Sequence, residues 1–549
     1  MRAVATAPLR KHILTVSVED YFHVAALRGA VLRKHWDRLE PHLSKNLDEV
    51  LELLASHGAK ATFFVLGETA TQQPEIVQRI MAARHEVAAS GWYPRSMKGT
   101  TPAEFRKEIR RTRDALEEAG AHRIIGYRSP GWMRRADLWM LDILAEEGFL
   151  YDSSVNPVLR RFGGHREKFR IHQHKHSSRD LFIWEFPITT VGVLGVRVPI
   201  SGGNYIRQFP HALLSRAVQN QVERDTDPVV FYFMPWEIDR QQPRIQGIST
   251  LQRIRHYRNL GKTRWVMEDY FQKMRFHGIA DQLGLAHVQP AAASPRAAEP
   301  SLTVGAPRPE VAVAEPVSLV VPMFNEEQNI RYLHRTLLAF RKRLSERYRI
   351  HFVLVDDCST DSTFQLLEST FAGVPDLELL RHQRNQGVAA ALLTGIRSAP
   401  TEIVCSIDCD CSYDPHNFEE MIPLIEHADM VTASPYHPQG HVLNVPSWRL
   451  FLSKTLSRMY SRVLRERFFT FTSCCRVYRK SALARIEVRN GGFLGVAETL
   501  IALKLAGGRI VEHPATLESR LLGHSKMKIA RTISAHLKLL SELARKSPR

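Results

Sequence analysis

Residues 402–415 read EIVCSIDCDCSYDP, a short apolar run that ends in two aspartates, Asp408 and Asp410. The run IVCSI has the length and composition of a buried strand, and the residues after it are typical of an irregular turn. Two carboxylates in such a turn can converge on one Mg²⁺ or Mn²⁺ and on the diphosphate that the ion binds, because these cations prefer oxygen ligands. An isolated Asp-x-Asp is more often a solvated loop, so its neighbours decide the interpretation.

Four further apolar runs in this half predict strands, and helical patterns separate them: VSLVVPMF, HFVLVDD, LELLRH and DMVTAS. This alternation predicts an open, doubly wound α/β sheet with its functional loops after the strands. The first strand should end at Pro322, with a helix that opens near Asn325 and carries Glu326 and Glu327 in its first turn. Acidic residues at successive strand ends suit ribose hydroxyls, a base edge and a metal.

Residues 316 to 535 resemble a family 2 glycosyltransferase of the GT-A fold, close to the dolichyl- and polyprenyl-phosphate sugar transferases. Besides the strand-end motifs, TSCCRVYRKSAL, FLGVAETL and ESRLLGHSKM follow in that family's order. The resemblance implies inverting transfer from a UDP- or GDP-sugar to a polyprenyl phosphate or a glycan. It also implies site residues. The residues expected to bind the nucleotide-sugar are Pro322, Asn325, Glu327, Asp356, Asp357 and Gly387. Asp408 and Asp410 are expected to bind Mg²⁺ or Mn²⁺ and, together with Glu498, to act in catalysis. The residues expected to bind the acceptor or its phosphate are Arg476, Arg520, Ser525 and Lys526.

Three of these assignments have structural alternatives. Glu498 would act as a base only for a hydroxyl acceptor, since a phosphate is already ionised, and it could instead stabilise a helix N-terminus. Arg520 and Lys526 could lie in a solvated loop. The C-terminal stretch KMKIARTISAHLKLLSELARKSPR predicts a basic amphipathic helix with Ile529, Ile533, Leu537, Leu540 and Ala544 on one face. Such a helix could lie on an anionic membrane surface or pack against its own domain.

The N-terminal half predicts a second α/β domain, a distorted (β/α) barrel. Its strand candidates are HILTVSVE, ATFFVLG, HEVAAS, IIGYRSP, FIWEFP and PVVFYFMP. An Ala- and Pro-rich stretch at 288–316 reads as a linker, so we expect domains at 1–287 and 317–549.

The order of motifs over residues 12 to 284 resembles the NodB-like polysaccharide deacetylases, in particular their exopolysaccharide-associated branch. By that resemblance Asp20 is the metal carboxylate, Glu19 the base and Arg128 the residue that orients it. The two metal histidines and the acid histidine of the family fall at Ser90, Pro94 and Met234. None of these can replace an imidazole as ligand or acid. We therefore expect an inactive deacetylase domain without catalytic zinc.

The net charge of +18, from 75 Lys and Arg against 57 Asp and Glu, favours an anionic partner. With no nucleic-acid-binding motif, phosphorylated substrates or a membrane surface are the expected partners. The six cysteines do not show the spacing of a zinc site or a secreted disulfide framework. With no signal peptide or membrane-spanning run, we expect a cytoplasmic protein, peripheral at the inner face of the cell membrane. Alternatives are a bifunctional N-deacetylase and glycosyltransferase, and a non-enzymatic polysaccharide- or membrane-binding scaffold.

Overall fold

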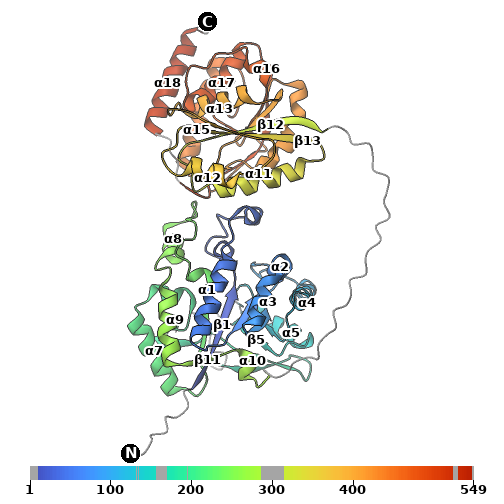
Figure 1. Ribbon diagram of the computed structural model, residues 1–549, viewed down its shortest axis with the longest axis vertical. Helices are drawn as coiled ribbons and strands as arrows, with labels where there is room; N and C mark the ends of the chain where they lie inside the picture. Colours follow the sequence, from blue (N-terminus) through green and yellow to red (C-terminus); the bar gives the residue numbers. More distant parts are fainter. Residues whose placement is uncertain are drawn as a thin grey trace, which may run out of the picture. The chain divides into compact units, whose positions relative to one another are not determined.

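The computed structural model describes residues 10–131, 133, 135–155, 170–193, 196–285, 314–523 and 529–546 (Figure 1). The chain forms two compact units. The first contains residues 1–29, 41–242 and 249–300, and the second contains 30–40, 243–248 and 301–549. The second unit therefore includes two short segments of the N-terminal half of the sequence.

The described residues of the first unit contain a nine-stranded sheet in the order β10-β1-β2-β3-β4-β5-β7-β6, with β11 also paired to β1. Its pairs are parallel except β6 with β7, as expected for a distorted barrel of β-α units. The strands are β1 Lys11–Val18, β2 Thr62–Val65, β3 Glu86–Ala89, β4 Gly126–Tyr127, β5 Tyr151–Asp152, β6 His172–Lys175, β7 Phe182–Glu185, β10 Val230–Phe233 and β11 Arg275–His277. A separate hairpin pairs β8 Thr190–Val193 with β9 Val196–Pro199.

Helices of this unit bury apolar faces against the sheet, and local capping sets where several of them begin. Helix α4 starts after Thr101, whose side chain accepts from Glu104 N, while Pro102 occupies the first helical position. The helices are α1 Leu43–Ser56, α2 Gly67–Gln72, α3 Pro74–Ala82, α4 Pro102–Glu118, α5 Trp139–Glu146, α6 Gly203–Gln208, α7 His211–Arg224, α8 Thr250–Tyr257, α9 Lys262–Lys273 and α10 Ile279–Gln282.

The second unit is built on a seven-stranded sheet in the order β14-β13-β12-β15-β18-β16-β19. The order of the parallel strands reverses between β12 and β15, which is the switch point of a doubly wound sheet. Strand β18 runs antiparallel between β15 and β16. The strands are β12 Glu315–Met323, β13 Tyr348–Asp356, β14 Leu377–Arg381, β15 Ile403–Ser406, β16 Met430–Ser434, β18 Arg476–Arg479 and β19 Ile510–Pro514; β17 His441–Leu443 pairs with β20 Thr516–Glu518 outside this sheet.

Helices cover both faces of this sheet (Figure 1). Helices α11 and α12 lie on one side of β12 and β13, and α13 and α17 lie on the other. Helix α18 packs against α15 and α17. The helices are α11 Ile330–Leu344, α12 Thr363–Thr370, α13 Val388–Ser398, α14 Phe418–Met421, α15 Ser447–Leu464, α16 Lys480–Leu483, α17 Phe493–Leu505 and α18 Ile529–Lys546.

The predicted α/β fold class is confirmed in both halves. The eleven strand candidates quoted above each contain a strand, and the predicted amphipathic C-terminal helix is present as α18. The predicted helix start near Asn325 is wrong. Asn325 has φ 55°, in the left-handed region, and α11 begins only at Ile330.

Candidate active site

Three carboxylates and one guanidinium meet beside the switch point of the second unit. Glu326 follows β12, Asp408 and Asp410 follow β15, and Arg520 follows β20. Arg520 Nε donates to Asp410 Oδ2 at 2.9 Å, Nη2 donates to Glu326 Oε1 at 3.0 Å, and Nη2 also forms an ion pair with Asp410 Oδ2 at 2.8 Å. Since the carboxyl ends of β12 and β15 border the crevice where the strand order reverses, these side chains converge although they lie far apart in the sequence.

The cluster has more negative than positive charge. Burial, and next the charge of Asp410, raise the pKa of Asp408 well above its usual value, although the Cys474 thiol bonds to that carboxylate. Burial also raises the pKa of Glu326. The Nη1 atom of Arg520 is buried and has no hydrogen-bond partner among the described residues. Carboxylates are the ligands that Mg²⁺ and Mn²⁺ prefer, and the N–H groups on Arg520 Nη1 can donate to an anion, although no group of three or more His, Cys, Asp or Glu side chains among the described residues is arranged to hold a metal ion.

Asn325 and Glu327, two residues expected at the nucleotide, connect two loops of the site. Asn325 N donates to Ser359 Oγ at 2.8 Å, and its Oδ1 accepts from Thr360 N at 2.7 Å. Glu327 Oε2 accepts from Ser362 N at 3.2 Å. Glu326 rather than Glu327 therefore faces the aspartates. The family resemblance assigned Glu327 and not Glu326 to the nucleotide-sugar, so the sequence missed the glutamate that contacts Arg520.

Asp356, Asp357 and Gly387 shape the neighbouring strand ends. Asp357 accepts from Gln386 N at 2.8 Å and from Gly387 N at 2.7 Å, and it bonds to His382 Nδ1 at 2.7 Å. Asp356 accepts from Ser359 N at 3.2 Å and pairs with Arg381 at 3.1 Å.

Gly387 precedes α13 with φ 96°, and a Cβ there would come within 2.6 Å of Gly491 O. Only glycine fits this approach.

Pro322, also expected at the nucleotide-sugar, is buried in β12.

The residues expected at the acceptor do not form one group. Arg476 is fully buried in β18, where it donates to Val496 O at 2.8 Å, Phe471 O at 2.7 Å and Thr432 Oγ1 at 3.3 Å. These bonds make it a core residue that connects β18 to its neighbours, rather than a group exposed to an acceptor. Ser525 and Lys526 lie outside the described residues.

Glu498 lies in the second turn of α17, not at its first turn. Its Oε2 accepts from Asn490 N at 2.9 Å and from Asn490 Nδ2 at 2.7 Å, so it holds the loop before that helix.

In the first unit, Glu19 and Asp20 follow β1 as expected, but Asp20 has local partners. Its carboxylate accepts from Tyr21 N at 2.8 Å, His42 N at 2.8 Å and Leu43 N at 3.0 Å. Burial raises the pKa of Glu19 to about 7. Asp20 therefore fixes both ends of the loop that joins β1 to α1.

The other residues assigned by the deacetylase resemblance are also in place around this sheet. Ser90 and Pro94 are buried after β3. Arg128 was expected to orient Glu19, but it donates to Ser153 O at 3.0 Å, Ser153 Oγ at 2.7 Å and Ser17 Oγ at 3.4 Å. The Met234 sulfur accepts from Trp236 Nε1 at 3.1 Å.

Three family models match the chain. Residues 36–146 match "Polysaccharide deacetylase", residues 153–283 match a domain of unknown function, and residues 318–487 match "Glycosyl transferase family 2". The resemblances inferred from the motifs are therefore confirmed for both halves.

Curated relatives match part of the chain. Polyprenol monophosphomannose synthase of Mycolicibacterium smegmatis is 30% identical over 219 residues, which are 38% of this chain and 80% of that protein. Undecaprenyl-phosphate mannosyltransferase of Micrococcus luteus is 28% identical over 38% of this chain and 87% of that protein. Dodecaprenyl-phosphate galacturonate synthase of Rhizobium johnstonii is 29% identical over 41% of this chain, which spans 65% of that relative.

Solved structures show more distant likenesses. Glucosyl-3-phosphoglycerate synthase from Mycobacterium tuberculosis, in complex with Mn²⁺, UDP and phosphoglyceric acid, is 16% identical over 42% of this chain and 78% of that one, with a TM-score of 0.32. A mutant of a CE4 family pseudoenzyme is 15% identical over 51% of this chain and 69% of that one, with a TM-score of 0.27. Such scores do not establish a common fold, which rests here on the strand orders.

Within the described ranges, no helix combines the length and the apolar character that crossing a bilayer requires. All six cysteines are free, and five of them are buried in the second unit.

Proposed function

Because the chain belongs to the family 2 glycosyltransferases through its C-terminal half, we propose that it transfers a sugar from a UDP- or GDP-sugar to a polyprenyl phosphate. The observation that carries this proposal is the cluster of Asp408, Asp410, Glu326 and Arg520 at the switch point of the sheet. A glycan is the alternative acceptor. The product would enter synthesis of a surface polysaccharide or glycolipid.

The cluster matches what the reaction needs. Breaking the bond between the anomeric carbon and the diphosphate leaves negative charge on the leaving group, which must be stabilised. Asp408 and Asp410 would hold Mg²⁺ or Mn²⁺, which as a Lewis acid neutralises such charge. Arg520 holds Asp410 in place and has free N–H groups on Nη1 for a phosphate oxygen. A phosphate acceptor needs no base, whereas a hydroxyl acceptor would need one, and Glu498 remains the proposed residue for it.

An apolar and basic surface on α15 favours a lipid-linked acceptor. Trp448, Phe451 and Leu452 are exposed, Phe451 to 69%, and the adjoining Arg449 and Arg458 are exposed as well. Aromatic side chains beside cationic ones suit the interface of an anionic membrane, where a polyprenyl phosphate has its headgroup. We propose that the protein acts at the cytoplasmic face of a membrane through this helix.

Helix α18 contributes to this surface only in part. Leu537 is 49% exposed, and Ile533 is also exposed, but Leu540 is buried and His536 Nδ1 bonds to Tyr460 Oη at 2.9 Å. The predicted single apolar face is therefore divided between the domain core and solvent. Ile529 lies in α18 outside the described side chains.

For the first unit we propose a deacetylase framework without deacetylase activity. Ser90, Pro94 and Met234 supply neither the two metal imidazoles nor the acid that the reaction needs. Residues 1–287 would then serve glycan binding or the support of the transferase.

A nucleotide-sugar screen tests the proposed function. The full-length chain should be stabilised by UDP or GDP in the presence of Mn²⁺, and it should transfer labelled sugar from the matching donor to undecaprenyl phosphate. Replacing Asp408 and Asp410 together by Asn should abolish both effects. Asp376→Asn, which alters an ion pair with Arg349 on the surface, is the matched control. Stabilisation and transfer that persist in the double variant would overturn the proposal.

A further inference from the structure

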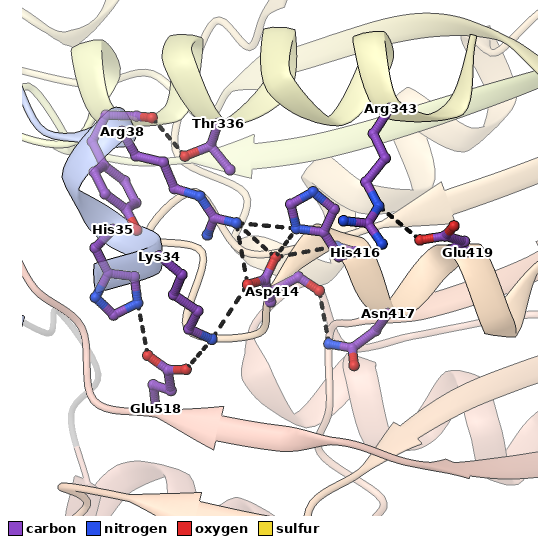
Figure 2. A network of polar contacts seen from close by, with 11 residues as sticks. Lys34, His35, Arg38, Thr336, Arg343, Asp414, His416, Asn417, Glu419 and Glu518 are labelled. Carbon is purple, nitrogen blue, oxygen red and sulfur yellow. Dashed lines mark hydrogen bonds and ion pairs between the residues drawn. The ribbon is translucent and has the colours of Figure 1, made fainter. Parts of the chain in front are cut away.

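Residues 30–40 belong to the transferase unit although the chain reaches them only about a dozen residues after β1. Their central part, Arg33–Arg38, is a 3₁₀ helix. Figure 2 shows that its polar side chains face two segments of the second unit, the loop at Asp414 and the end of strand β20 at Glu518. Residues 243–248, the other N-terminal segment of the second unit, contact the stretch that follows β20, because Gln246 N donates to Leu521 O at 2.7 Å.

The first set of contacts is centred on Asp414. Arg38 Nη2 lies 2.9 and 3.1 Å from its two carboxylate oxygens, and Lys34 Nζ lies 3.3 Å from Oδ2 (Figure 2). His416 Nδ1 lies 2.7 Å from Asp414 Oδ1 and 3.1 Å from Arg38 Nη2, so its tautomer decides whether it donates to the carboxylate or accepts from the guanidinium. Arg38 is only 5% exposed. Burial alone would raise the pKa of Asp414, but its bonds to His416 and Arg38 hold that pKa well below its usual value.

The second set is centred on Glu518. His35 Nε2 lies 2.9 Å from Glu518 Oε2, and Lys34 pairs with Oε1 (Figure 2). His35 is 3% exposed, so this contact is part of the packed interior of the unit. The Asp414 loop and β20 are also joined directly, since Glu518 N donates to Ser412 O at 2.9 Å and Tyr413 forms a bridge with Leu517.

Asp414 and Glu518, the two residues that Arg38, Lys34 and His35 contact, lie close in sequence to the proposed diphosphate site. Asp414 is four residues after Asp410, and Glu518 is two residues before Arg520. Asp410 and Arg520 are themselves joined by a hydrogen bond of 2.9 Å and an ion-pair contact of 2.8 Å. A shift of the Asp414 loop or of the end of β20 would therefore change the distance between the proposed metal ligand Asp410 and the guanidinium of Arg520. Displacements of about 1 Å at a reacting centre can cost about 10²-fold in rate.

We propose that residues 30–40 are a positioning element of the transferase, in which Arg38, His35 and Lys34 hold Asp414 and Glu518 and thereby set Asp410 and Arg520 for the diphosphate. This inference rests on the proposed function. It assigns the deacetylase-like half a role in sugar transfer that needs no chemistry of its own.

The degenerate deacetylase site has a corresponding part. Asp20 accepts from the backbone N–H groups of Tyr21, His42 and Leu43, which are the two ends of the loop from which residues 30–40 leave. The carboxylate that the deacetylase resemblance assigns to a metal thus closes this loop.

The experiment uses the full-length chain with UDP and GDP, each with Mn²⁺, as binding probes, followed by turnover of the matching nucleotide-sugar. Arg38→Met should raise the Mn²⁺ concentration for half-maximal rate and lower kcat about tenfold, with a smaller change in the KM for the acceptor. In an Asp414→Asn chain, Arg38→Met should lower kcat by less than about a further twofold, because the carboxylate that Arg38 positions is already lost. Arg343→Met is the matched control, since it removes a 2.8 Å contact with Glu419 seen in the same view (Figure 2).

A second variant covers the case in which Arg38→Met does not fold. Lys34→Met with His35→Gln leaves the Arg38–Asp414 contact intact and should shift the Mn²⁺ dependence in the same direction. If a folded Arg38 variant or the Lys34/His35 variant kept the wild-type Mn²⁺ dependence and kcat, this inference would be overturned while the proposed function would stand. A fall in kcat in Arg343→Met as large as that in Arg38→Met would have the same consequence. A wild-type chain that binds neither diphosphate would overturn the proposed function, and this inference with it.

Discussion

Replacing Arg520 by Met tests the proposed site most directly. The substitution removes the one described cation that contacts Asp410 and Glu326, and it leaves three neighbouring carboxylates without a counter-charge. Removing one partner of a buried ion pair costs about 3–5 kcal/mol. Because the Arg520 side chain is 20% exposed, we expect the low end, about 3 kcal/mol. For a unit of this size that corresponds to a fall in Tm of about 6–12 °C.

The same substitution should lower the transfer rate by about 10²–10³-fold, the usual effect of losing one group that stabilises developing negative charge. Adding Glu326→Gln should recover part of the Tm, because one repelling carboxylate is removed, but it should not recover the rate. Scanning calorimetry and a transfer assay on the same samples separate the two effects. Arg349→Met, which opens an exposed ion pair, should change neither. A rate within tenfold of wild type, or an unchanged Tm, would refute the reasoning.

Three further outcomes follow from the structure. Burial and the charge of Asp410 raise the pKa of Asp408, so protons compete with Mn²⁺ at higher pH than for an ordinary aspartate. The affinity for Mn²⁺–UDP or Mn²⁺–GDP, measured by calorimetry, should therefore fall as the pH is lowered from about 8 to about 6. Protonation of Asp408 over the same range relieves its repulsion with Asp410 and stabilises the ligand-free fold. An affinity that does not change with pH would contradict this prediction. Ser90 and Pro94 occupy the positions of the two metal histidines, so the first unit should not bind zinc. An Asp408→Asn chain, which lacks one proposed metal ligand of the second unit, should retain far less than one zinc ion per chain after dialysis, measured by elemental analysis. Tight binding of one zinc ion per chain, with release of acetate from N-acetyl sugars, would show an active deacetylase. Phe451→Asp should weaken sedimentation with phosphatidylglycerol vesicles about tenfold, whereas Leu251→Asp, at an exposed leucine of α8, should not; equal binding by all three chains would remove α15 from the membrane surface.

Local patterns sufficed for the strands and for much of the candidate site. Strand runs such as 402–408 are short, apolar and bounded by turn residues, so their identity is encoded within a few residues. Gly387, which the resemblance assigned to the nucleotide-sugar, precedes α13 with a positive φ that favours glycine. Strand β18 was not predicted, because RVYR is short and is a strand only through its pairing with β15 and β16.

Side-chain partners were less predictable than elements. Arg476 looked like an anion-binding residue, yet backbone carbonyls and a hydroxyl from three other segments surround it in the core. Arg128 bonds to Ser17 and Ser153 instead of to Glu19. Most of these partners lie 20 or more residues away in sequence, and hydrogen-bond geometry depends on where the packed elements place their ends.

The sequence by itself determined the α/β class of both halves, the family of each, and the pair Asp408–Asp410, because strand periodicity and motif order are local properties of the chain. Only the tertiary structure decided that Glu326 and Arg520 join this pair, since they meet it through the strand order at the switch point. The tertiary structure also decided that residues 30–40 belong to the transferase unit. Nothing in RKHWDR marks a partner several hundred residues away, because a buried ion pair appears only when folding brings Arg38 and Asp414 together.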